Sequence, residues 1–118
     1  MATPPLEDRL AHIVDAIRRI ETIWRGKSFE DYKCEPVLVA ATERYLEKIC
    51  EAVKHIPKDE KSLHPQIPWV EIRGLGNRLR HGYETIDDAL VWDVVTKDLA
   101  ALKTAIERIR AGLRGPRR

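Results

Sequence analysis

The sequence predicts an all-α protein that folds as a four-helix up-and-down bundle, with one extra short turn or helix in a connector. Apolar residues recur at steps of three and four over long segments, which places them on one face of a helix. No segment alternates apolar and polar residues as a half-buried strand does. Prolines and glycines separate the helical segments, and such short connections are typical of a bundle.

The first helix is expected over residues 4–25. Its apolar stripe begins at Leu6 and ends at Trp24, with alternating steps of four and three. Thr3 is the expected N-terminal cap, because its hydroxyl can accept a backbone hydrogen bond. Gly26 is the expected stop, because glycine readily adopts the backbone conformation that ends a helix. The connector that follows has room for the extra helical turn.

The second helix is expected over residues 36–56, followed by a loop over 57–68 that contains three prolines and mixed charges. A third, shorter helix is expected over 68–81. Gly74 and Gly76 lie inside this helix, where each lowers helix propensity by roughly 1 kcal/mol. Glycines in such positions often indicate that two helices approach closely.

The last helix is expected to begin at Asp87 or Asp88, either of which can cap it. From there its apolar residues continue in steps of three and four to Leu113. We therefore predict a single domain over residues 1–113 and a basic, disordered tail over 114–118.

The apolar stripes are wider than one small core needs. Ile23, Trp24, Val91 and Trp92 are not expected to share that core, so part of this surface is assigned to a homodimer interface near the third and fourth helices. The chain has 118 residues, a formal net charge of +2 and two cysteines whose spacing suggests neither a metal site nor a disulfide framework. We expect a cytoplasmic protein with no membrane partner.

A basic cluster, GNRLRHGY, occupies residues 76–83 at the end of the third helix. Asn77 and Arg78 precede His81 by four and three residues and can share its face, about 40° and 60° away around the helix. Arginine binds phosphate oxygens, and histidine can take a proton from a ribose 2′-hydroxyl or protonate a leaving oxygen. This chemistry requires no metal or other cofactor. Spacing alone leaves open a plain solvated helix end, whose charges complement the helix dipole.

Several segments together resemble one known family. PWVEIRGLGNRLRHGYETIDDALVWDVV, GKSFEDY, AATERYLEKICEAVKHIP and DLAALKTAIERI agree in order and spacing with the HepT-like toxins, small all-helical proteins of the HEPN superfamily. The resemblance extends over nearly the whole chain and implies an HEPN-like bundle. It also implies a metal-independent ribonuclease toxin of a type VII toxin–antitoxin system, which cleaves RNA at a dimer cleft.

The catalytic motif of that family is an arginine, four to six residues, a histidine, one residue and a tyrosine. Asn77, His81 and Tyr83 match it, but the arginine position holds Gly76. By resemblance, His81 is the general acid/base, and Tyr83 is the residue to which a cognate nucleotidyltransferase antitoxin adds AMP.

The missing arginine leaves two hypotheses open. In the first, the protein is an active ribonuclease in which Arg78, beside Asn77 and His81, completes the catalytic set. Arg73 and Arg80 are then further candidates for phosphate binding. In the second, it is a catalytically impaired HEPN protein that binds a nucleotide or a nucleotidyltransferase. Restoring arginine at Gly76 is expected to raise ribonuclease activity under the first hypothesis.

Overall fold

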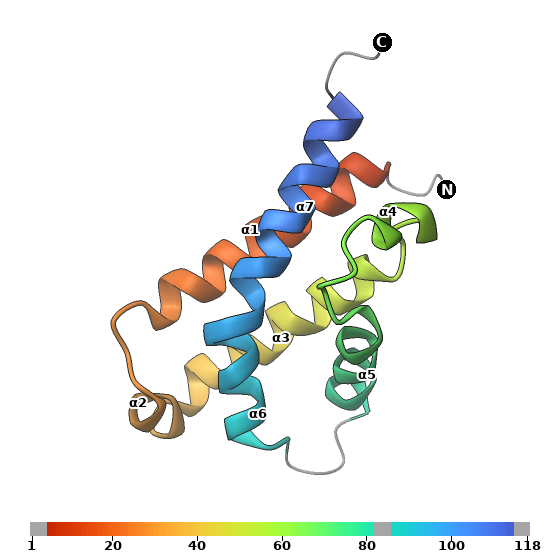
Figure 1. Ribbon diagram of the computed structural model, residues 1–118. Helices are drawn as coiled ribbons and strands as arrows, with labels where there is room; N and C mark the ends of the chain where they lie inside the picture. Colours follow the sequence, from red (N-terminus) through yellow and green to blue (C-terminus); the bar gives the residue numbers. More distant parts are fainter. Residues whose placement is uncertain (1–4, 82–85, 115–118) are drawn as a thin grey trace.

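Two long helices, α1 (Leu6–Trp24) and α3 (Pro36–Val53), pack side by side in opposite directions and form the centre of the fold (Figure 1). The computed structural model describes residues 5–81 and 86–114. α7 (Leu99–Arg114) packs on α1, and α5 (Trp69–Arg80) packs on α3. The described residues thus confirm the predicted all-α, HEPN-like helical bundle.

Shorter helices occupy the connections and the start of the last long segment. A serine–aspartate capping box fixes the start of α2 (Phe29–Lys33), because the side chains of Ser28 and Asp31 each accept a hydrogen bond from the backbone N–H of the other. This helix is the predicted extra turn. The last predicted helix does begin after Asp87, whose carboxylate caps it at Ala89, but a π-helical segment interrupts it. These elements are α2 (Phe29–Lys33), α4 (Lys58–Ser62), α6 (Asp88–Asp93) and η1 (Val94–Asp98).

The loop prediction for residues 57–68 is wrong in part, because α4 lies within it. Pro57 is the N-cap residue of α4. Proline is tolerated there because the backbone N–H that it lacks would have no partner within the helix. Trp69 holds the following turn in place. Its indole N–H lies 3.1 Å from the carbonyl oxygens of both Lys61 and His64. None of the residues of α4 is buried, so this helix depends on such contacts rather than on an apolar stripe.

The core lies where α1, α3 and α7 meet. Apart from Tyr32 of α2, its largest fully buried side chains come from the predicted stripes: Leu10, Ile13, Ile17, Ile20, Leu46, Ile49 and Ile106. Gly26 follows the end of α1 with a φ of +75°, as expected for a glycine that ends a helix. α7 continues through Arg114, one residue beyond the predicted domain boundary, whereas Thr3 and residues 115–118 lie outside the described residues.

The four apolar residues that were not expected to share one core largely do share it. Trp24 and Val91 are buried, while Ile23 and Trp92 are half-buried against the core. α2 contributes Tyr32 to this apolar group, and the ring centroid of Tyr32 lies 4.9 Å from that of Trp24. The expectation that these four side chains cannot share one core is therefore wrong, whereas the homodimer stays a prediction. None of the described helices is long and apolar enough to cross a membrane.

Candidate functional site

The basic cluster predicted from the sequence lies at the C-terminal end of α5. His81 is the C-cap residue, and its backbone N–H donates to the carbonyl oxygen of Asn77 at 3.0 Å. Arg78 and Arg80 occupy the last turn, where positive charge complements the negative end of the helix dipole. All four of these side chains are exposed. Helix-end stabilisation therefore accounts for part of this charge, whatever else the cluster does.

Arg80 turns toward α3 and contacts Glu51. Its Nη2 lies 2.8 Å from Glu51 Oε1, and its Nη1 lies 3.4 Å from Asn77 Oδ1. Glu51 also pairs with Lys54 at 3.3 Å and lies 3.7 Å from His55. The hydrogen bond with Lys54, followed by the charges of its basic neighbours, lowers the pKa of Glu51 below its ordinary value. Glu51 thus holds Arg80 beside α3, and Arg80 in turn donates to Asn77.

A polar groove of about 770 Å³ runs between α1 and α3 and ends at Arg80. Two small residues, Ala16 and Ala52, lie along it. Among the described residues, neither Arg9 nor Lys48 in its lining forms an ion pair. The other cations of the groove, Arg19, Arg44 and Arg80, each pair with a carboxylate. The lining of this groove is therefore mixed in charge but predominantly basic.

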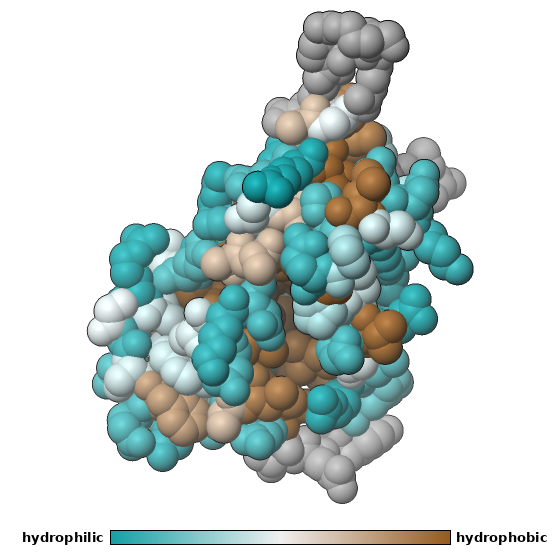
Figure 2. Space-filling view, in the orientation of Figure 1, coloured by the Kyte–Doolittle hydropathy of each residue, from teal (hydrophilic) through white to brown (hydrophobic). Residues whose placement is uncertain are grey.

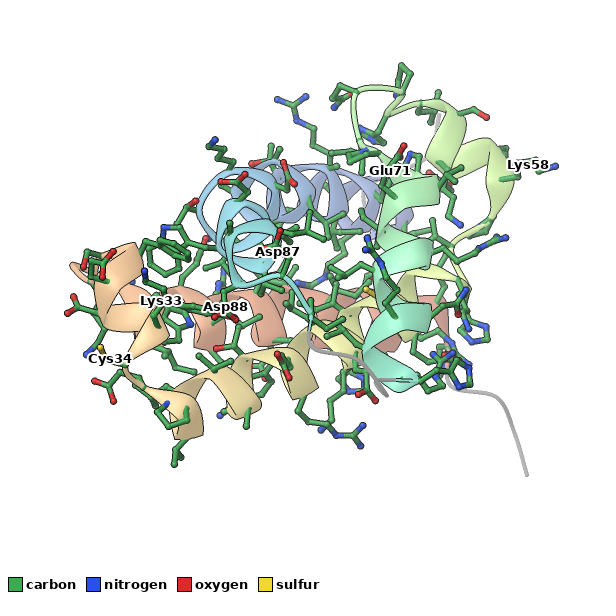
Figure 3. All side chains as sticks on the ribbon, turned by 90° about the horizontal axis from the view of Figure 1, so that it is seen from below. Lys33, Cys34, Lys58, Glu71, Asp87 and Asp88 are labelled. Carbon is green, nitrogen blue, oxygen red and sulfur yellow. The ribbon has the colours of Figure 1, made fainter. Side chains whose placement is uncertain are left out.

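Arg78 lines a different hollow. That hollow, of about 300 Å³, lies between α5 on one side and α6, η1 and α7 on the other, and its lining is mainly apolar. Figure 2 shows hydrophobic side chains at the bottom of a hollow in this face of the molecule. Glu71 lies on the side of α5 that faces this space (Figure 3), and Asp98 lines it from η1. The sequence predicted one shared space for Asn77, Arg78 and His81, and this stays a prediction. Arg80, which contacts Asn77, and Arg78 line separate hollows.

Gly76 lies where α5 packs tightly against α3. A Cβ atom built at this position would lie 2.6 Å from Cβ of Cys50, far inside van der Waals contact. Burial also raises the pKa of the Cys50 thiol to about 11. Close packing explains the glycine here, as the sequence suggested. Gly74 makes no comparable approach, because nothing lies within 4 Å of a Cβ built there.

Arg73 lies two turns before Arg80 on the same side of α5. It lines a third hollow, of about 520 Å³, together with Lys54, Lys58 and Lys61. Sequence reasoning missed these three lysines. Their spacing of four and three residues was a usable signal, but the proline at position 57 made the segment look like a loop.

Two predictions about the site are not tested by the geometry. Tyr83 lies outside the described residues, as does the preceding Gly82, so the proposed turn toward His81 stays a prediction. Over residues 5–81 and 86–114, no three His, Cys, Asp or Glu side chains gather in a group that could hold a metal ion. The expected metal independence of the chemistry likewise stays a prediction.

Comparison with known proteins adds what the geometry lacks. A family model described as "Ribonuclease HepT-like" matches residues 13–109. The chain belongs to the HepT-like family. A protein of Thermococcus cleftensis named "Probable ribonuclease HepT" is 40% identical over 104 residues, which is 88% of this chain and 94% of the relative. "Putative RNase TTE0752" of Caldanaerobacter subterraneus is 35% identical over 100 residues, covering 85% and 89% of the two chains. No solved structure matches the chain.

The residues that the family model matches include the elements that form the candidate site. Residues 13–109 contain all of α3 and α5, the basic end at His81, and the start of α6. The family assignment supports a nuclease and agrees with the resemblance seen in the sequence.

Proposed function

We propose that this HepT-like chain is a metal-independent endoribonuclease, the toxin of a type VII toxin–antitoxin system, with His81 as its general acid/base. The observation that carries the proposal is the exposed His81 at the cationic end of α5, in a chain of a ribonuclease family. The relatives named as ribonucleases cover most of the chain, which supports the same activity.

The chemistry needs one proton acceptor and fixed positive charge. His81 takes the proton of a ribose 2′-hydroxyl, and the 2′-oxygen attacks the adjacent phosphorus. The bond from phosphorus to the 5′-oxygen breaks, and a proton returns to that leaving oxygen. Arg80 and Asn77, held together beside Glu51, donate hydrogen bonds to the phosphate oxygens as negative charge develops. Such a path leaves a 2′,3′-cyclic phosphate and a free 5′-hydroxyl.

A homodimer is part of the proposal. The apolar hollow between α5 and the α6–α7 segment borders Arg78, and a second copy seated there would exclude water beside the motif helix. Arg78 would then serve the site across the dimer cleft. Light scattering at micromolar concentration is expected to give twice the 13.6 kDa chain mass, and a monomer mass would remove this part.

Silencing by a cognate nucleotidyltransferase is also proposed, with Tyr83 as the AMP acceptor. A bulky anion added two residues after His81 would repel RNA and compete for the nearby arginines. Incubation with ATP, magnesium and the nucleotidyltransferase is expected to add one adenylyl group to the wild-type chain and none to Tyr83→Phe. AMP mapped to another residue, or no mass change in the wild type, would contradict this.

A second candidate function is favoured by Gly76. The family motif has an arginine there, and the approach to Cys50 leaves no room for a Cβ atom. The chain would then be a catalytically impaired HEPN protein that binds a nucleotide or a nucleotidyltransferase. In that case the basic groove would hold its ligand without cleaving it.

One cleavage assay separates the two. Purified protein is incubated with single-stranded RNA in excess EDTA, and products are tested for the cyclic phosphate end. Wild type and His55→Ala, an exposed histidine at the end of α3, are expected to cleave, while His81→Ala loses at least about 10² in rate. RNA that stays intact with wild type but is bound by it would support the impaired protein instead. Equal cleavage by His81→Ala would refute the role of His81.

A further inference from the structure

The hollow that Arg73 lines, at the corner formed by the end of α3, by α4 and by the start of α5, gathers positive charge. Its lining includes Lys54, Lys58, Lys61 and Arg73, with Trp69 and the exposed Val70 beside them. Among the described residues, no aspartate or glutamate lines this hollow. We call these four cations the corner cluster.

The charges of the corner cluster are largely uncompensated. Lys54 pairs with Glu51, which lies outside the hollow, but no other member forms an ion pair with a described residue. Lys61 Nζ instead lies 5.9 Å from the centroid of the Trp69 ring. Partial burial, and then the charge of Arg73, lower the pKa of Lys61. Lys61 and Arg73 carry like charges that repel each other, and a bound anion would relieve that repulsion.

The fold holds these cations in place rather than leaving them on a free loop. The indole N–H of Trp69 bonds to the carbonyl oxygens of Lys61 and His64, which ties the end of α4 and the turn after it to the start of α5. Lys58 extends outward from α4 at the edge of the molecule (Figure 3). The corner therefore presents several cations on a fixed backbone. Because no loop has to be ordered when a ligand binds there, the entropy cost of binding is small.

The corner cluster is continuous with the proposed catalytic end. Arg73, Asn77 and Arg80 follow at steps of four and three, so they form one stripe along α5. From Arg73 to His81 the helix rises about 12 Å, which is on the order of three phosphates at the ~3.4 Å axial spacing of one strand. A polyanion lying along this stripe would reach both ends.

We propose that the corner cluster binds the phosphodiester backbone of the RNA strand whose cleavage occurs at His81. The assignment rests on the ribonuclease function proposed above. It adds a binding subsite about two turns away from the chemistry, where Lys58 and Arg73 contact phosphates and do not take part in bond breaking. Because such contacts release counterions, they contribute salt-dependent affinity without sequence preference.

Binding and cleavage can be measured separately. Fluorescence anisotropy is followed with a short single-stranded RNA whose 2′-hydroxyls are methylated, so that it cannot be cleaved, from about 50 to 200 mM salt. Lys58→Gln/Arg73→Gln is expected to bind about tenfold more weakly at low salt. The slope of log affinity against log salt should become shallower by about 0.7 for each lost contact, or about 1.4 in total. Lys97→Gln/Arg108→Gln, which removes two exposed cations that do not line this hollow, should match wild type.

The outcomes discriminate between the claims. Unchanged affinity and slope in the corner variant would overturn the subsite, even if the wild type cleaves RNA. In a second outcome, wild type binds the methylated RNA more tightly than the corner variant does but leaves ordinary RNA intact. That result would keep the subsite and overturn the ribonuclease function. Poly-glutamate that binds the corner as tightly as RNA would overturn the nucleic-acid assignment in favour of an acidic protein surface.

Discussion

Replacing Gly76 by alanine tests the closest contact in the candidate site. The new Cβ would lie 2.6 Å from Cβ of Cys50, whereas carbon atoms attract best at about 3.5–4.0 Å. Rotating the cysteine side chain cannot relieve this overlap, because Cβ does not move with χ1. The helices must shift instead, and overpacking of this kind destabilises a protein by about 1–3 kcal/mol.

Gly74 supplies a matched control on the same helix. It is exposed, and nothing lies within 4 Å of a Cβ built there. Alanine in place of glycine inside a helix adds about 0.8–1.0 kcal/mol of stability. Both substitutions gain this propensity term, so the difference between the two variants isolates the contact with Cys50.

Urea unfolding followed by circular dichroism measures that difference. We expect Gly74→Ala to raise the free energy of unfolding by about 1 kcal/mol. Gly76→Ala should lie between no change and a loss of about 2 kcal/mol, because the overlap opposes the same gain. If Gly76→Ala stabilises as much as Gly74→Ala, the close approach of α5 to α3 is refuted.

The cysteine side of the contact offers a second check. In a double-mutant cycle, Cys50→Gly should relieve the overlap and couple favourably with Gly76→Ala by about 1 kcal/mol or more. The same background gives the motif arginine a fair test. With Cys50→Gly present, Gly76→Arg is expected to raise RNA cleavage, by up to the 10²–10³ that one charged transition-state contact supplies. A folded variant with unchanged cleavage would contradict the missing-arginine explanation.

Three further predictions follow from single contacts. Thr42→Val should cost about 1–3 kcal/mol in urea unfolding, because it leaves a buried indole N–H without its acceptor at 2.8 Å. Glu51→Gln should free Arg80 and strengthen binding of the methylated RNA, while stability changes by less than about 1 kcal/mol. Hydrogen bonds with Ser28 lower the pKa of Asp31 below its ordinary value of 3.8. The stabilisation that the ionised Asp31 carboxylate provides is therefore fully present above pH 3.8. The effect is lost as pH falls through the lower folded-state pKa, and urea midpoints of wild type and Asp31→Asn should converge there.

The long helices were predictable because each buries a stripe set by local periodicity. α1, α3 and α5 lie within a few residues of their predicted bounds for that reason. α4 was missed because it has no apolar stripe, and contacts from Trp69 hold the turn that follows it. η1 was missed because apolar residues continue at steps of three and four through it, so the pattern resembles an ordinary helix.

The candidate site divides in the same way. The residue types and spacing of Asn77, His81 and the neighbouring arginines were readable from the sequence, and so was the unusual glycine at position 76. The partner of each side chain was not. Arg80 and Arg78 are two residues apart, yet one faces Glu51 and the other an apolar hollow.

The sequence by itself determined the helical faces, the family and the chemistry that the end of α5 can offer. Only the tertiary structure decided which cation faces which groove, why a side chain at position 76 overlaps Cys50, and where Lys54 and the lysines of α4 meet Arg73. The physical reason is the separation along the sequence of the residues that interact. Helix periodicity is fixed by residues three and four apart, whereas the contact of Arg80 with Glu51 joins residues 29 positions apart and exists only because α5 packs on α3.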